Sequence, residues 1–410
     1  MNCRLRNGLA TAALGACAFS MACGADDVDR SQPLPEPTPD AGGPAADEGP
    51  QLLLHTCRQD ETQQSTNPAS IEAPTFRETE RQVGVAVSAA SLLDPAYSAI
   101  LAAQFNQLTP ENEMKWDAIE PQPGVFDFTR ADTIVAFAAA NGMQVRGHAL
   151  VWHSQLPAWM EALTGADAVR EAMTRHIQTV VTHFRDTFPG TVVAWDVVNE
   201  AINVMQGPMG GTASYRDSVF YRELGEGFIA EAFQIARAAD PDIRLYYNDF
   251  GVEGTGGAKS TATFDMVSAL VAAGVPVQGM GFQMHTGPLD QGPNAGDFAA
   301  NIARYAALGL EVEVTEMDVS LCSIGTNVLG LELQRFRYNR VVSACLESPA
   351  CRSVTLWGLS DPNSWLNTNG CMQGMVVLDT EPSPLAFDAS LAPKPAWWGI
   401  YDALTGCAYQ

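Results

Sequence analysis

The sequence predicts a single α/β domain, a (β/α)8 TIM barrel, preceded by an export signal and a disordered tether rich in Pro, Asp and Gly. From about residue 80, short apolar and β-branched runs alternate with longer helical patterns, which is typical of βα units around a parallel sheet. A length of 410 residues with 46% hydrophobic residues suits one large barrel plus a tail. The predicted strands are Gln82–Val87, Phe105–Thr109, Gln144–Val151, Val192–Val198, Arg244–Asn248, Val277–Gln283, Glu311–Thr315 and Val354–Leu359.

Helical patterns fill the intervals between several of these strands. Gly142 and Gly274 stand where a helix would end, since glycine readily adopts the conformation that follows a helix. The predicted helices are Ala131–Asn141, Val169–Phe188, Phe220–Ala239, Ser260–Ala273 and Leu331–Leu346.

The first 22 residues have the layout of an export signal. Arg4 and Arg6 precede a short, mostly apolar run that ends at Ala22, and this run is too short for a membrane-spanning helix. Cys23 follows a small residue and resembles the lipidated cysteine of bacterial lipoproteins, although Cys17 follows a better-matching but earlier motif. We therefore expect an exported protein that is either secreted or lipid-anchored at the cell surface, through Cys23 in the second case.

Residues 23–75 are predicted to form a tether and N-terminal extension, and residues 76–410 the barrel domain. The segment between Asp26 and Pro50 is rich in Pro, Asp, Glu, Gly and Ala and has almost nothing to bury, so we expect an extended chain.

The net charge indicates which partners to exclude. There are 47 acidic and 23 basic residues, which gives a formal charge of −24. Such a chain repels nucleic acid and anionic lipid surfaces, so a neutral or weakly charged substrate fits better. The sequence contains no recognisable metal cluster or cofactor motif, and we expect a monomer without a cofactor.

Six of the nine cysteines lie beyond residue 50, and an even number in an exported chain favours disulfides over metal binding. Six cysteines allow 15 pairings. Spacing suggests the pairs Cys345–Cys351, Cys322–Cys371 and Cys57–Cys407.

Polar side chains gather directly after the predicted strands. Glu200 follows the fourth predicted strand and Glu316 the seventh. Because the carboxyl ends of barrel strands form one rim, these residues are expected to converge there. Two carboxyl groups, one protonated and one ionised, are the machinery of retaining glycoside hydrolysis. Either glutamate alone would more often be a solvated loop residue.

Seven ordered motifs resemble glycoside hydrolase family 10, the barrel xylanases, over roughly residues 80–402. They are Thr109–Trp116, Arg146–Gln155, Trp195–Ala201, Tyr246–Asp249, Gly281–His285, Val314–Asp318 and Trp357–Trp365. The resemblance implies endo-acting hydrolysis of β-1,4-xylosidic bonds with retention, on xylan or xylo-oligosaccharides.

The resemblance also implies the roles of individual residues. Glu200 is expected to be the general acid/base and Glu316 the nucleophile, with His285 holding Glu316 charged and Asn199 contacting the sugar 2-hydroxyl. Further expected substrate-binding residues are Lys115, His148, Gln283, Trp357 and Trp365 around the −1 sugar, Glu111, Asn112, Trp152 and Gln155 around the next sugar, and Tyr247 and Asn248 on the leaving side.

Asp196 and Asp318 are interpreted as orienting or solvated residues, because both catalytic positions are already filled.

Departures from the family pattern leave the preferred substrate open. Leu366 stands where many members have Arg, and Cys371 follows in the same loop, so this loop is expected to be remodelled. Ala149 replaces a frequent Thr behind His148. Two alternatives remain: an endo-β-1,4-glucanase on the same barrel, and a non-catalytic glycan-binding surface protein. Bulky aromatic residues such as Trp365 could exclude glucose by clashing with its hydroxymethyl group.

Overall fold

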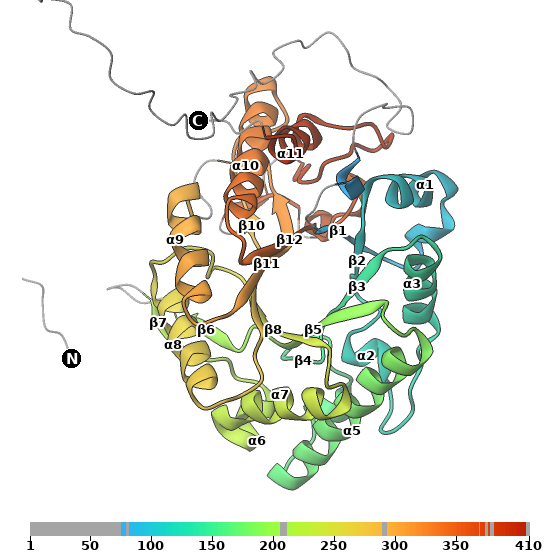
Figure 1. The fold of residues 1–410 in the computed structure, drawn as a ribbon, viewed down its shortest axis with the longest axis vertical. Coiled ribbons are helices and arrows are strands. Elements are labelled where there is room, and N and C mark those ends of the chain that lie inside the picture. The colour runs from blue at the N-terminus through green and yellow to red at the C-terminus, as the bar shows by residue number, and fades with distance from the viewer. Residues whose placement is uncertain are drawn as a thin grey trace, which may run out of the picture. The chain divides into compact units, whose positions relative to one another are not determined.

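The chain folds into a closed barrel of parallel strands surrounded by helices (Figure 1). In space the strands follow the order β1, β2, β3, β5, β8, β9, β11 and β12, and β12 pairs with β1 to close the barrel. This arrangement confirms the predicted TIM barrel. The computed structural model describes residues 75–78, 82–205, 211–288, 293–368, 370–373, 376–377 and 381–406.

The eight barrel strands lie close to their predicted positions. Two short strands, β4 (Val151–Trp152) and β10 (His285–Thr286), follow β3 and β9 after a break and pair with β5 and β11. The barrel strands are β1 (Gln82–Val87), β2 (Gln107–Pro110), β3 (Gln144–Gly147), β5 (Val192–Asn199), β8 (Arg244–Asp249), β9 (Gly279–Phe282), β11 (Glu311–Val319) and β12 (Cys351–Leu356).

The helices form the outer ring in Figure 1. Several begin at a side-chain cap: Asp94, Asn294 and Asn327 each accept a hydrogen bond from a backbone N–H in the first turn. The longer helices are α1 (Pro95–Gln104), α3 (Thr129–Ala140), α5 (Ala166–Thr187), α7 (Phe228–Ala239), α8 (Ala258–Ala272), α9 (Ala295–Ala306), α10 (Val328–Leu346) and α11 (Pro395–Leu404), and the shorter ones are α2 (Trp116–Ile119), α4 (Ala158–Glu161) and α6 (Val219–Leu224).

The helix predicted over Phe220–Ala239 is wrong in one respect, because the structure divides it into α6 and α7. A 3-10 turn, η4 (Gly225–Gly227), separates the two, and Gly225 has a φ of 65° that interrupts the α-helical backbone. A glycine adopts this left-handed conformation without the steric cost that a Cβ atom imposes.

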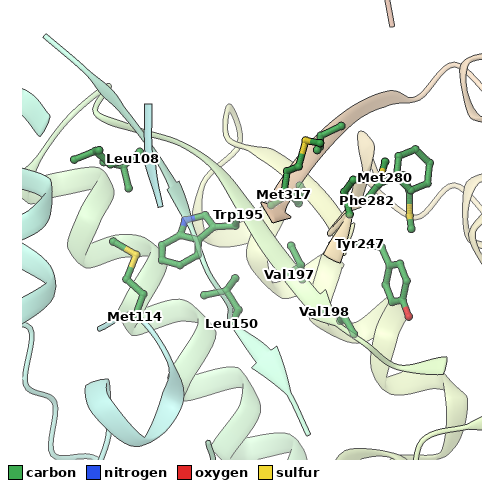
Figure 2. Packing of buried hydrophobic residues seen from close by; sticks show 14 of the residues in the cluster. Leu108, Met114, Leu150, Trp195, Val197, Val198, Tyr247, Met280, Phe282 and Met317 are labelled. Atoms are coloured by element: carbon green, nitrogen blue, oxygen red, sulfur yellow. The ribbon is translucent and has the colours of Figure 1, made fainter. Parts of the chain in front are cut away.

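Apolar side chains from the strands fill the core, as Figure 2 shows for Leu108 of β2, Trp195 of β5 and Phe282 of β9. The Trp195 ring occupies space that β3 leaves free at Gly147. A Cβ atom at Gly147 would lie 2.2 Å from this ring, so only glycine fits there.

Segments outside the barrel strands shape its rim. An antiparallel hairpin, β6 (Ile202–Met205) with β7 (Thr212–Tyr215), follows β5 and was not predicted. The loop after β12 contains two 3-10 turns, η5 (Asp361–Asn363) and η6 (Trp365–Thr368). The remaining elements are η2 (Phe76–Glu78), η3 (Ser91–Leu93), β13 (Met372–Gln373) and β14 (Val376–Val377).

Two of the three predicted disulfides are confirmed. Cys322 pairs with Cys371 and Cys345 with Cys351. The predicted pair Cys57–Cys407, the signal segment and residues 23–74 lie outside the described residues. No described helix combines the length and apolarity needed to cross a membrane.

Candidate active site

Glu200 and Glu316 lie at the same end of the barrel, because β5 and β11 are parallel strands of one sheet. Glu200 directly follows Asn199, the last residue of β5, and its side chain is 12% exposed. Glu316 lies within β11, and its side chain is 5% exposed. The Glu200 backbone has a φ of 58°, and its N–H donates to the Asn248 carbonyl oxygen at 2.9 Å.

Two donors face the Glu316 carboxylate. Asn248 Nδ2 donates to Oε1 at 2.7 Å, and His285 Nε2 lies 3.3 Å from Oε2. Burial alone would raise the pKa of Glu316, but electrostatic attraction by His148 and the hydrogen bond from His285 outweigh it and lower the pKa below its ordinary value. Glu316 is therefore ionised, as a carboxylate nucleophile must be.

His285 bridges two carboxylates. Its Nδ1 lies 2.9 Å from Asp318 Oδ2, on the side opposite Glu316. Burial opposes the charge, yet the Asp318 carboxylate, together with Glu316, raises the pKa of His285 well above its usual value. His285 is thus an imidazolium that donates from both ring nitrogens.

Amide side chains connect the two glutamates. Gln283 Nε2 donates to Glu200 Oε1 at 3.0 Å. The terminal atoms of the Asn199 amide lie 3.0 Å from Asn248 Nδ2 and 3.2 Å from Gln283 Nε2. Since Asn248 also donates to Glu316, a chain of hydrogen-bonded amides runs from one carboxyl group to the other.

Two basic residues, Arg216 and His153, lie near the second carboxyl oxygen of Glu200, Oε2. Arg216 follows β7, and its Nε donates to the Glu200 carbonyl oxygen at 2.9 Å, with a terminal nitrogen 3.8 Å from Glu200 Oε2. His153 Nδ1 lies 3.9 Å from the same oxygen. Burial and the nearby Arg216 charge lower the pKa of His153 to about 4, so His153 is neutral at neutral pH.

Lys115 lies at the centre of another group of rim side chains. Its Nζ donates to Gln155 Oε1 at 2.7 Å and to Asn112 Oδ1 at 3.1 Å, and it lies 4.8 Å from the centre of the Trp152 ring. Burial lowers the pKa of Lys115, although the surrounding carboxylates, Glu316 foremost, favour its charge. Burial also raises the pKa of the neighbouring Glu111.

His148 and the aromatic residues complete the rim. The buried His148 directs Nδ1 to Asp196 Oδ2 at 2.9 Å, and its ring lies 5.3 Å from that of Trp357. Trp365, on η6, packs its ring 5.2 Å from that of His285 and is 39% exposed. Asp196 and Asp318 thus each orient a histidine, in line with their predicted orienting role.

Tyr247 does not fit its expected place on the leaving side. Its side chain is fully buried, and its hydroxyl donates to Asp249 Oδ2 at 2.6 Å while accepting from the Ala201 N–H at 2.9 Å. The ring therefore packs in the core (Figure 2), where no sugar can reach it. Asn248 is also fully buried, and its contacts with Glu316 make it an orienting residue.

Arg216 and His153 had no assigned role in the sequence. His153 could have been found, because it stands with other polar residues directly after β4. Arg216 could not, because it reaches Glu200 only through the unpredicted hairpin of β6 and β7. Within the described part of the chain, no cluster of His, Cys, Asp or Glu has the make-up of a metal site.

A parallel barrel that carries an ionised glutamate and a second glutamate at one rim defines the class of protein, a glycoside hydrolase. The comparison with known families agrees, since the model of glycosyl hydrolase family 10 matches residues 73–403. The chain therefore belongs to glycosyl hydrolase family 10, which confirms the predicted membership.

Known relatives are similar over most of their length. Endo-1,4-beta-xylanase B of Thermotoga neapolitana is 39% identical over 313 residues, which span 75% of this chain and 83% of the relative. Among solved structures, xylanase 10B of Thermotoga petrophila in complex with xylobiose has a TM-score of 0.72 at 35% identity, covering 81% of this chain and 96% of that one. A variant of xylanase 10C of Cellvibrio japonicus in complex with xylopentaose has a TM-score of 0.73 at 35% identity, covering 82% and 70%.

Proposed function

We propose that the protein is an endo-1,4-β-xylanase that hydrolyses xylan with retention of anomeric configuration by double displacement. The observation that carries this proposal is the contrast between the two glutamates. Glu316 is held ionised between Asn248 and His285, whereas the Glu200 carboxyl group accepts a hydrogen bond from Gln283 and lies 3.8 Å from a terminal nitrogen of Arg216. One group can therefore attack while the other transfers a proton.

In the first step, a Glu316 oxygen attacks the anomeric carbon of the −1 xylose. Glu200 gives its proton to the glycosidic oxygen as the bond between that oxygen and the anomeric carbon breaks. In the second step, the ionised Glu200 takes a proton from water, and the water oxygen displaces Glu316 from the anomeric carbon. Two inversions at this carbon give a product with the β configuration.

The residues around the two glutamates are suited to hold the sugars. Gln283, in contact with Glu200, and His148, held by Asp196 beside Trp357, are candidates for contacts with hydroxyl groups at the −1 position. The hydrogen-bonded group around Lys115 offers charged and amide donors for the next sugar. The remaining assignments follow the family pattern: Trp357 and Trp365 at −1, Glu111, Asn112, Trp152 and Gln155 at the next sugar, and Asn199 at the 2-hydroxyl.

Two observations favour xylan over glucan as the substrate: the ligands of the similar solved structures and the fixed ring of Trp365 at the rim. The similar solved structures hold xylobiose and xylopentaose. Trp365 is fixed by a hydrogen bond to Asp318, so its ring cannot easily move aside for a hydroxymethyl group. A non-catalytic glycan-binding protein is less favoured, because such a protein gains nothing from keeping an ionised, buried Glu316.

Hydrolysis assays with purified protein test the proposal. We expect reducing sugar from glucuronoxylan and arabinoxylan and far less from carboxymethylcellulose, with a β-anomer as the first product in proton NMR. Glu316→Ala should abolish turnover, and Glu200→Ala should regain activity on an aryl xylobioside when azide is added. A preference for carboxymethylcellulose would overturn the substrate class, and a first product in the α form would overturn retention.

We also propose that the protein is exported and anchored to a lipid surface through Cys23, or else released. The charged start, the short apolar run and the small residue before Cys23 support export. Incorporation of radiolabelled palmitate that disappears in Cys23→Ser would establish the anchor, whereas an unlabelled protein in the medium would establish release.

A further inference from the structure

The two oxygens of the Glu200 carboxyl group lie in different surroundings. Oε1 accepts a hydrogen bond from Gln283 Nε2 at 3.0 Å. Oε2 lies 3.8 Å from a terminal nitrogen of Arg216 and 3.9 Å from His153 Nδ1, and both distances exceed that of a hydrogen bond. Because Oε1 already accepts, the proton of the acid form belongs on Oε2. The two basic side chains therefore face the oxygen that carries the proton.

The hairpin of β6 and β7 fixes Arg216 beside Glu200. Arg216 directly follows β7, and its backbone N–H donates to the Ala201 carbonyl oxygen at 2.8 Å. Its Nε donates to the Glu200 carbonyl oxygen at 2.9 Å, and its side chain is 18% exposed. Neither of these hydrogen bonds uses a terminal nitrogen of the guanidinium.

One terminal nitrogen of Arg216, Nη2, is a buried donor without a hydrogen-bond partner among the described residues. It is the nitrogen that lies 3.8 Å from Glu200 Oε2. The next residue along the chain, Asp217, is exposed and pairs with Arg222 at 3.1 Å. A buried donor that stays unsatisfied lowers stability, so a partner that forms during the reaction would account for the placement of Nη2.

The separation between Arg216 and Glu200 suits a group that must begin the reaction with its proton. A hydrogen-bonded ion pair would hold Glu200 in its ionised form, with no proton for the glycosidic oxygen. Once the proton has left, Oε2 bears negative charge, and a movement of about 1 Å brings Nη2 to the roughly 2.8 Å of a charge-assisted hydrogen bond. His153 adds no charge, because burial and the Arg216 charge lower its pKa to about 4.

We propose that Arg216 is a positioning residue for the general acid: it stabilises the negative charge that develops on Glu200 Oε2 as the proton moves to the glycosidic oxygen. In this step the O–H bond of Glu200 breaks and its electron pair stays on Oε2. The proton bonds to the glycosidic oxygen, which keeps the electron pair of its broken bond to the anomeric carbon. The proposal rests on the proposed function, since it needs Glu200 to be the acid.

Two substrates with the same sugars and different leaving groups test the proposal. Dinitrophenyl xylobioside releases a weakly basic phenolate that departs with little help from an acid, whereas phenyl xylobioside releases a basic one that needs the proton. On both substrates kcat/KM reports the first step. In Arg216→Gln, we expect kcat/KM to fall by about tenfold or more on the phenyl substrate and by less than about threefold on the dinitrophenyl substrate.

Two further variants serve as controls. Arg216→Lys keeps a positive charge near Oε2 but loses the Nε donor, and it should retain most of the wild-type ratio between the two substrates. Arg222→Gln removes a neighbouring cation that pairs with the exposed Asp217, and it should change neither value. A purely structural role of Arg216 predicts equal losses on both substrates in Arg216→Gln and no recovery in Arg216→Lys.

Equal losses on the two aryl substrates in Arg216→Gln would overturn the proposal. A loss confined to xylotetraose would also overturn it, because Arg216 would then bind the leaving sugar instead. The result is a ratio measured on one preparation, so a lowered content of folded enzyme cancels. If Arg216→Gln does not fold at all, Arg216→Met keeps the apolar stem and replaces it with the same expected ratio.

The proposed function and the role of Arg216 can fail separately. A wild type that prefers aryl cellobiosides would overturn the substrate class, and the same two leaving groups on cellobiose would then test Arg216. A wild type that is active on both aryl xylobiosides, with a ratio that Arg216→Gln leaves unchanged, would overturn the role of Arg216 alone.

Discussion

The indole nitrogen of Trp365 donates a hydrogen bond to Asp318 Oδ2 at 2.9 Å. The same oxygen lies 2.9 Å from His285 Nδ1, and His285 Nε2 lies 3.3 Å from the Glu316 carboxylate. One buried carboxylate thus holds both an aromatic wall of the rim and the imidazolium that faces the nucleophile. The shape of the rim beside the substrate and the charge of the nucleophile therefore both depend on Asp318.

Asp318→Asn is expected to move the acid limb of kcat/KM to higher pH. Asp318 raises the pKa of His285, so its neutral replacement lowers that pKa, and the loss of the imidazolium raises the pKa of Glu316. Because only ionised Glu316 attacks, activity on the acid side should fall by about tenfold for each pH unit by which the limb moves. A pH profile of kcat/KM on an aryl xylobioside measures the effect.

The matched control is Asp132→Asn, which breaks a second pair of aspartate and histidine, between helices α3 and α5. Asp132 of α3 lies 2.8 Å from His183 Nε2. This variant should leave the pH profile unchanged. An acid limb that stays in place in Asp318→Asn would refute the role of the imidazolium.

Trp365→Ala should weaken discrimination between xylan and glucan. The ring is packed against His285 and tied to Asp318, so its removal opens space beside the −1 sugar. We expect kcat/KM on xylo-oligosaccharides to fall by about tenfold or more, while hydrolysis of cello-oligosaccharides falls less or rises. Trp365→Phe keeps a ring without the donor and should retain most of the discrimination. Equal losses on both substrates would show that the ring only binds.

Much of the fold could be predicted because its physical causes are local in the sequence. Apolar β-branched runs mark the barrel strands, and parallel strands place their following residues at one rim, which brings Glu200 and Glu316 together. The pair Cys345–Cys351 follows from its short spacing. The predicted pair Cys322–Cys371 is also confirmed. Its two cysteines stand in the loops that follow β11 and β12, and these two strands are neighbours in the barrel.

Side-chain direction was harder to predict, because it depends on register. The pairing of β5 with β8 shifts between Asp196 and Val198, next to Tyr247. Such an irregularity changes which residues face the barrel interior, and nothing in the sequence marks it. The contact between Arg146 and Glu313 joins residues 167 positions apart, so only the closed barrel reveals that two buried charges meet.

His153 should titrate in NMR with a midpoint of about 4. Its unfolded-state value is about 6.5, so between these two pH values the unfolded chain binds more protons than the folded one. The free energy of unfolding should therefore fall as the pH drops from about 6.5 to 4. His153→Gln should flatten this part of the profile in urea unfolding measured at pH 4, 5 and 7. A midpoint near 6.5 would contradict the buried, Arg216-facing position.

The two disulfides should differ in their contribution to stability. Cys322–Cys371 spans 49 residues and Cys345–Cys351 spans 6, and the entropy that a cross-link removes from the unfolded chain grows with the enclosed loop. Replacing both cysteines of a pair with serine should lower the free energy of unfolding by about 4 kcal/mol for the longer loop and about 2 kcal/mol for the shorter one. Guanidinium unfolding of the two double variants measures this.

The longer disulfide should also matter for catalysis, because Cys371 lies in the same loop as Trp365 and its partner follows β11, the strand of Glu316. We expect the serine pair at 322 and 371 to raise KM on xylotriose by about threefold, an ordering cost of less than 1 kcal/mol for the loosened loop. The pair at 345 and 351 joins α10 to the first residue of β12 and should leave KM unchanged after its smaller loss of stability. An equal rise of KM in both double variants would assign the effect to global destabilisation. Unchanged kinetics in the variant at 322 and 371 would show that the loop is held without the disulfide, by the hydrogen bond from Trp365 to Asp318.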